Sequence, residues 1–200
     1  AEYGVNGAGG YEGVDILVSP NPGGSHFRSG NNCFGFVSNP QNDSWATFDG
    51  DFFTQGSPEN GWGIEIIDGA NDFTSANNCN DGFWGITMGM PGSITSYSVV
   101  GTTIIITWEG DYINGAYNLH IKLDYMLGIN DLYYTTTVTI TNNGINIPEF
   151  YYYRNIDPDN NVSISGDFTT QNTIVSQAGG GGGDTALVKA TSNLPASQPT

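Results

Sequence analysis

The clearest alternation of apolar and polar positions covers residues 116–127. Its apolar members are Tyr117, Leu119, Ile121, Leu123 and Tyr125, and its polar members are Asn118, His120, Lys122 and Asp124. A period of two gives a β-strand one buried face and one solvent face. The pattern resumes at residues 132–141 after the turn formers at 128–131, so the sequence predicts a β-hairpin.

Similar short apolar runs recur along the chain and are separated by Gly, Asn, Asp and Pro. No segment combines a helical period with both caps. We therefore expect an all-β fold, an antiparallel β-sandwich of roughly twelve strands with long Gly-, Asn- and Asp-rich loops. Residues 1–191 are expected to form one domain, and residues 192–200 a linker-like tail.

The turn formers also predict how some strands connect. Residues 142–144 are expected to lead the hairpin directly into a strand at 147–154, which gives a three-stranded meander. Further turns are expected at residues 110–111 and 114–115. Residues 68–81 show no strand pattern and are expected to form a polar loop, either ordered by a cation or simply exposed.

An aromatic strand that runs into oxygen donors, at residues 151–161, is the strongest candidate for chemistry. Asp157, Asp159 and Asn161 recur at every second position, a spacing that can aim several oxygens at one hard cation such as Ca²⁺. An Asx-rich turn with Arg154 paired to a nearby acid is the alternative. The candidate metal ligands in all acidic segments are Asp157, Asp159, Asn161, Asp68, Asp72, Asp81, Asp49 and Asp51.

The composition restricts the possible partners and the compartment. Four Lys and Arg against 20 Asp and Glu give a formal charge of −16, which repels nucleic acid and anionic lipid. No apolar run is long enough to insert into a membrane. Abundant Gly, Asn, Thr and Ser are typical of secreted all-β proteins, so an extracellular or cell-surface location is expected. Cys33 and Cys79 are expected to form a disulfide there, with buried free thiols as the alternative.

Aromatic and carboxylate side chains supply the remaining candidates. Trp62 and Trp84 lie beside loops, where a ring can stack on a ligand, although core packing is the favoured interpretation. Tyr153 and Arg154 are further candidate ligand contacts. Glycoside hydrolysis would need a carboxylate pair, for which Glu65 and Glu109 are the strand-borne candidates. His120, on a polar face, is expected to be an exposed bystander.

Residues 151–160, together with residues 48–53 and 61–63, resemble the ligand-binding modules of bacterial surface adhesins of the repeats-in-toxin type. The resemblance implies a Ca²⁺-dependent β-sandwich that captures a peptide or glycan on another cell. It also implies that Asp157 and Asp159 are metal ligands and that Arg154 is their neighbour.

We therefore expect a secreted, Ca²⁺-dependent adhesion domain rather than an enzyme. The first alternative is a structural subunit of an extracellular filament or surface layer, which assembles with neighbouring copies by strand addition. A carbohydrate-active enzyme with paired carboxylates ranks third.

Overall fold

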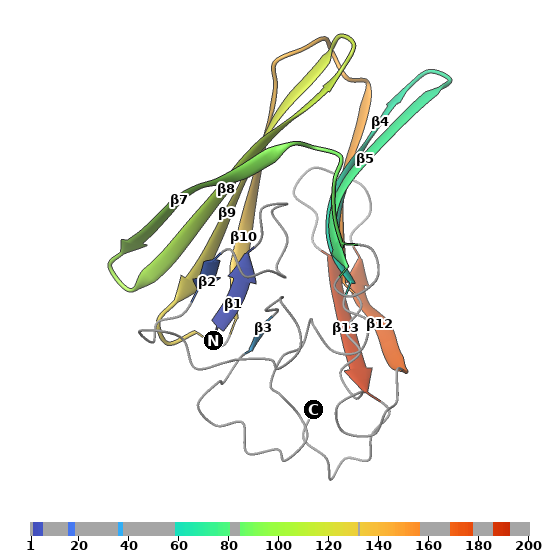
Figure 1. Cartoon of the computed structure of the whole chain (residues 1–200). Helices are drawn as coiled ribbons and strands as arrows, with labels where there is room; N and C mark the ends of the chain where they lie inside the picture. Colours follow the sequence, from blue (N-terminus) through green and yellow to red (C-terminus); the bar gives the residue numbers. More distant parts are fainter. Residues whose placement is uncertain are drawn as a thin grey trace.

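The structure, a computed structural model, describes residues 2–5, 16–18, 36–37, 59–80, 85–131, 133–156, 169–177 and 186–192. In these residues every regular element is a β-strand, and the strands lie in four sheets (Figure 1). All the strand pairs described are antiparallel. The predicted all-β, antiparallel class is therefore confirmed.

The first sheet has the strand order β10-β9-β8-β7. Its members are β7 (Gly92–Val100), β8 (Thr103–Asn114), β9 (Tyr117–Gly128) and β10 (Thr135–Asn142). Alternate side chains of β9 are buried, from Tyr117 to Leu127, as the sequence pattern predicts. The predicted hairpin of β9 and β10 is also confirmed, with Val138 opposite Leu123.

The second sheet has the strand order β11-β4-β5-β6. Its members are β4 (Glu59–Asp68), β5 (Asn71–Asn80), β6 (Gly85–Met88) and β11 (Glu149–Ile156). The predicted meander is wrong, because β11 does not pair with β10 and instead pairs with β4. The physical reason is that the apolar face of β9 needs a second layer, to which β11 contributes Phe150 and Tyr152.

The predicted polar loop at residues 68–81 is also wrong, because residues 71–80 form β5. A tight turn links β5 to β4, with Gly69 at φ 64° in the first central position, as in a type II′ turn. The ladder runs from Asp68 opposite Asn71 to Glu59 opposite Asn80. Pairing with an apolar neighbouring strand therefore outweighs the weak β-propensity of a segment rich in Asn and Asp.

The inner faces of the two sheets meet in one hydrophobic core. Trp62 of β4 and Trp108 of β8 pack edge to face, with ring centroids 5.2 Å apart. Phe73 of β5 and Tyr117 of β9 lie 5.4 Å apart by the same measure. The fully buried core also contains Ile64, Ile66, Met90, Ile106, Leu119, Ile121, Leu123, Tyr125 and Leu127.

A buried asparagine fixes the crossover from β6 to β7. The Asn77 side chain donates a hydrogen bond of 2.9 Å to the Met90 carbonyl and accepts one of 2.8 Å from the Met90 amide. Both groups lie in the core, where unpaired backbone atoms would be costly. Asn77 thus supplies the partners of Met90. On either side of Met90, the Gly89 amide bonds to Ala76 of β5 and the Pro91 carbonyl accepts from Asp111 of β8.

The turn predicted at residues 110–111 is wrong, because β8 continues through Gly110, which lies opposite Gly92. A Cβ at Gly110 would come within 2.4 Å of the Trp108 ring, and one at Gly92 within 2.3 Å. These glycines therefore make room for a large buried ring. The turn predicted at residues 114–115 is confirmed, with Gly115 at φ 59°.

Two smaller sheets complete the described part of the chain. One has the order β2-β1-β3 and contains β1 (Glu2–Val5), β2 (Ile16–Val18) and β3 (Phe36–Val37). The other is the hairpin of β12 (Thr170–Gln177) and β13 (Ala186–Ser192). In the described range no helix is long and apolar enough to cross a membrane.

Candidate functional site

The end of the second sheet at Ile156 is where the predicted calcium segment begins. Ile156 of β11 and Cys79 of β5 both pair with Asn60 of β4. Adjacent strands are about 4.8 Å apart, so these two positions are about 10 Å apart across the sheet. Asp157 and Asp81, both predicted metal ligands, follow them within one and two residues in the sequence.

The predicted ligands Asp68 and Asp72 lie at the opposite end of this sheet, beside the β4–β5 turn. A strand of ten residues spans about 30 Å, so they cannot share an ion with a site beyond Ile156. Asp68 accepts a hydrogen bond of 2.5 Å from the Tyr117 hydroxyl, which raises the pKa of Tyr117. This contact joins the two sheets and gives Asp68 a structural role.

The other predicted metal and disulfide residues lie outside the described residues. These are Asp49, Asp51, Asp81, Asp157, Asp159, Asn161 and Cys33, and Cys79 is described only as a backbone position of β5. Among the described side chains, no three His, Cys, Asp or Glu residues are placed to hold a metal ion. The calcium and disulfide hypotheses therefore stay predictions, because they concern residues outside the described part of the chain.

Arg154, a predicted ligand contact, extends toward the core. Its guanidinium carbon lies 5.8 Å from the centre of the Tyr125 ring, and its Nη1 donates a hydrogen bond of 3.2 Å to the Tyr152 hydroxyl. A delocalised cation over an aromatic face is a favourable contact. The position supports a structural role for Arg154 between the two sheets.

The predicted aromatic contacts separate into one core residue and one surface residue, and Trp84 lies outside the described residues. Trp62 is 1% exposed and belongs to the core, as the favoured interpretation predicts. Tyr153 is 42% exposed on the outer face of the second sheet, and Tyr151 beside it is 47% exposed. Of the predicted aromatic ligand contacts with described side chains, only Tyr153 is therefore exposed.

We call the outer surface formed by Glu149, Tyr151, Tyr153 and Glu65 the tyrosine face. Tyr151 pairs with Glu65 and Tyr153 with Gly63. A Cβ at Gly63 would lie 2.3 Å from the Tyr153 hydroxyl oxygen. Because the strands are about 4.8 Å apart, the Tyr153 ring must extend across β4 rather than stand away from the sheet.

The same face is acidic. The Tyr151 hydroxyl donates a short hydrogen bond to Glu149, and this bond raises the pKa of Tyr151 above its ordinary value. The negative charges of Glu149 and Glu65 raise it further. Tyr151 therefore remains a neutral phenol beside two carboxylates.

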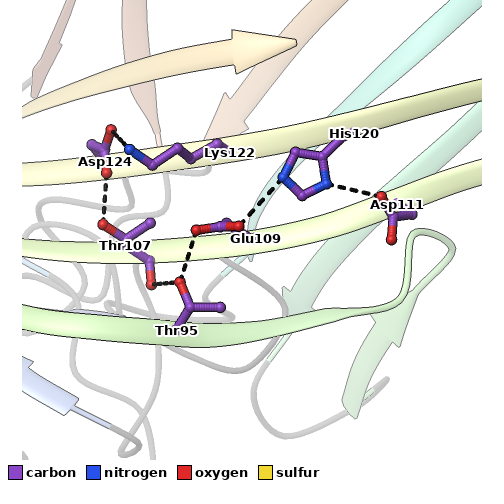
Figure 2. A network of polar contacts seen from close by, with 7 residues as sticks. All are labelled: Thr95, Thr107, Glu109, Asp111, His120, Lys122 and Asp124. Atoms are coloured by element: carbon purple, nitrogen blue, oxygen red, sulfur yellow. Dashed lines mark hydrogen bonds and ion pairs between the residues drawn. The ribbon is translucent and has the colours of Figure 1, made fainter. Parts of the chain in front are cut away.

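A polar network on the outer face of the first sheet was not anticipated from the sequence (Figure 2). His120 Nδ1 lies 2.9 Å from Asp111 Oδ1, and its Nε2 lies 3.3 Å from Glu109 Oε2. The contact with Asp111, reinforced by the charges of Asp111 and Glu109, raises the pKa of His120 despite some desolvation. His120 is therefore not a bystander: when protonated, it donates to both acids.

The network continues along β8 and β9. Lys122 Nζ lies 2.8 Å from Asp124 Oδ2, and the Thr107 hydroxyl donates a bond of 2.6 Å to Asp124 Oδ1. Thr95 adds a bond of 3.1 Å to Glu109. Lys122 thus meets an acid two residues along its own strand, whereas His120, Thr107 and Thr95 meet acids on a neighbouring strand. These cross-strand pairs stabilise the charges on the sheet face.

The two carboxylates considered for hydrolysis are not brought together. Glu65 belongs to the tyrosine face of the second sheet, whereas Glu109 belongs to the polar network of the first. The core of both sheets lies between them. They do not form the close carboxylate pair that glycoside hydrolysis requires.

The described part of the chain is thus an all-β protein of antiparallel sheets with an acidic, tyrosine-bearing outer face. Comparisons with protein-family models, curated proteins and solved structures find no match for this chain.

Proposed function

We propose that this chain is an extracellular, Ca²⁺-dependent adhesion domain with a β-sandwich fold, which binds a peptide or glycan on another cell. The observation that carries the proposal is that β5 and β11 both end at the same end of the second sheet. The strands that precede Asp157 and Asp81 end about 10 Å apart on either side of β4.

Calcium would act at this end of the sheet as a cross-link between acidic segments. It takes six to eight oxygen ligands, which Asp157, Asp159, Asn161 and Asp81 can supply in part. Neutralising these carboxylates removes repulsion in a chain with a formal charge of −16. An ordered segment next to β11 also lowers the entropic cost of binding a ligand at that strand.

The proposed Cys33–Cys79 disulfide would reinforce the same region, because Cys79 lies in β5 opposite Asn60. A closed ring of about 45 residues contributes roughly 4 kcal/mol in the loop-closure model. Mass spectrometry of a non-reduced chymotryptic digest would detect the linked peptides, because Phe, Trp and Tyr cleavage sites such as Trp45 and Phe73 lie between the two cysteines, whereas no Lys or Arg does.

The test of adhesion is a peptide and glycan array probed in calcium and in a chelator. We expect binding in calcium only, and we expect Asp157→Asn to abolish it. Asp72→Asn makes the same charge change at the far end of the sheet and should bind like the wild type. Equal binding by all proteins in both buffers would contradict the proposal.

A structural subunit that assembles by strand addition is the second candidate, and the β12–β13 hairpin favours it. Ile174, Val175, Leu187 and Val188 are all more than half exposed there. A two-stranded hairpin is only marginally stable alone, so an added strand or sheet would stabilise it. Sedimentation that stays monomeric at high concentration would count against assembly.

A further inference from the structure

We infer that the tyrosine face binds an extended peptide segment that carries lysine or arginine at alternate positions. This inference deepens the proposed adhesion function, because it names the class of ligand and the surface that would hold it. It rests on the exposure of two tyrosines, on their spacing and on the charge around them.

The spacing of the rings matches an extended peptide. Tyr151 and Tyr153 are two residues apart on β11, so their Cα atoms are about 6.7 Å apart. Alternate side chains of an extended partner have the same spacing and point to one side. Because β11 is the outermost strand in the described order of its sheet, such a partner can lie alongside it.

The charge of the face selects a cationic partner. Glu149 and Glu65, both in the tyrosine face, flank Tyr151. Arg154 is the one Lys or Arg within β4, β5, β6 and β11 as described, and its side chain lies over Tyr125 toward the core. An ammonium or guanidinium group gains both a carboxylate and an aromatic ring here.

The same charge argues against the other occupants. A second copy of this chain also carries a formal charge of −16, so two copies would repel each other at this face. A neutral glycan can stack on a tyrosine but gains nothing from the ionised carboxylates beyond hydrogen bonds. The basic peptide is the occupant that uses the rings and the charges together.

The test is a titration of the calcium-loaded protein with a synthetic hexapeptide of alternating lysine and threonine. We expect Tyr151→Ser and Tyr153→Ser each to weaken binding about threefold to fivefold. Tyr153→Phe keeps the ring and should bind normally. Glu65→Gln should weaken binding about twofold to fivefold, since exposed ion pairs are weak.

Matched controls separate a site from general attraction to an acidic protein. Tyr133→Ser removes a tyrosine that is 63% exposed elsewhere, and Asp111→Asn removes one negative charge from the first sheet. Neither should change the affinity. Equal weakening by Asp111→Asn and Glu65→Gln, or no effect of the two tyrosine-to-serine variants, would overturn the inference.

Two further experiments test whether the tyrosine face binds a glycan or a second copy of the chain instead. Binding of a neutral chitohexaose that depends on Tyr153, without binding of the lysine peptide, would overturn the inference in favour of a glycan. Self-association that Tyr153→Ser abolishes would overturn it in favour of a second copy.

Repeating the peptide titration in chelator distinguishes this inference from the calcium proposal. Tyrosine-dependent binding that persists in chelator supports the face and contradicts the requirement for calcium.

Discussion

At the scale of single residues, His120 shows how a strand side chain acquires a role from its neighbours across the sheet. The two-residue turn at Gly115 and Ala116 fixes the β8–β9 register, which places Asp111 opposite His120 and Glu109 opposite Lys122. The hairpin turn at residues 114–115 was predicted, but the further turn predicted at 110–111 hid this pairing. Counting back from the correct turn would have found the network.

The raised pKa of His120 predicts a specific pH dependence of stability. The folded protein holds the imidazole proton more tightly than the unfolded chain does. The resulting stabilisation is therefore complete below the ordinary pKa of about 6.5 and is lost as the pH rises through the raised value. His120→Gln should flatten this part of the profile, measured by urea unfolding from acid to alkaline pH. A variant profile as steep as that of the wild type would refute the assignment.

Asn77 predicts the cost of losing one buried polar side chain. Asn77→Ala leaves the amide and carbonyl of Met90 unpaired in the core, so we expect a loss of about 2–5 kcal/mol in the free energy of unfolding. Asn172→Ala, at an exposed position of β12, should change it by less than about 0.5 kcal/mol. Similar urea midpoints for the two variants would show that the Met90 contact contributes little.

At the scale of elements, the sequence predicts a strand well where its own apolar and polar residues alternate strongly. It predicts a strand poorly where the strand forms because it pairs with a neighbouring strand. β9 and β10 were predicted because their own side chains alternate. β5 was missed because its inward positions include Ser75 and Asn77, so apolar alternation is weak. The signal for the hairpin was Gly69 followed by Ala70, a Gly-X pair of the kind that type II′ turns use. The partner of β11 was not predictable, because strand pairing between distant segments depends on the whole core.

The β4–β5 turn gives a prediction that separates a hairpin from a loop. A Cβ at Gly69 meets no atom within 4 Å, so only its positive φ opposes a larger residue. Gly69→Ala should therefore cost about 1–2 kcal/mol, and Gly69→Asn less, because Asn tolerates this conformation. In a flexible loop the alanine would be neutral or stabilising. Urea unfolding of the two variants distinguishes these cases.

At the scale of the whole molecule, one hydrophobic core joins the two four-stranded sheets. The candidate site could be predicted only in part. Tyr153, a predicted ligand contact, is exposed, whereas the inward direction of Arg154 depends on strand register, which the sequence alone does not specify. The proposed calcium segments begin where β5 and β11 end.

Thermal unfolding in calcium and in chelator tests the central claim most directly. An ion at 1,000 times its dissociation constant contributes about 4 kcal/mol. For a chain of this size, that corresponds to a melting temperature lower by about 8–16 °C in chelator. Asp157→Asn should melt low in both buffers, and Asp72→Asn should respond like the wild type. A wild-type melting temperature that is the same in calcium and in chelator would contradict the account.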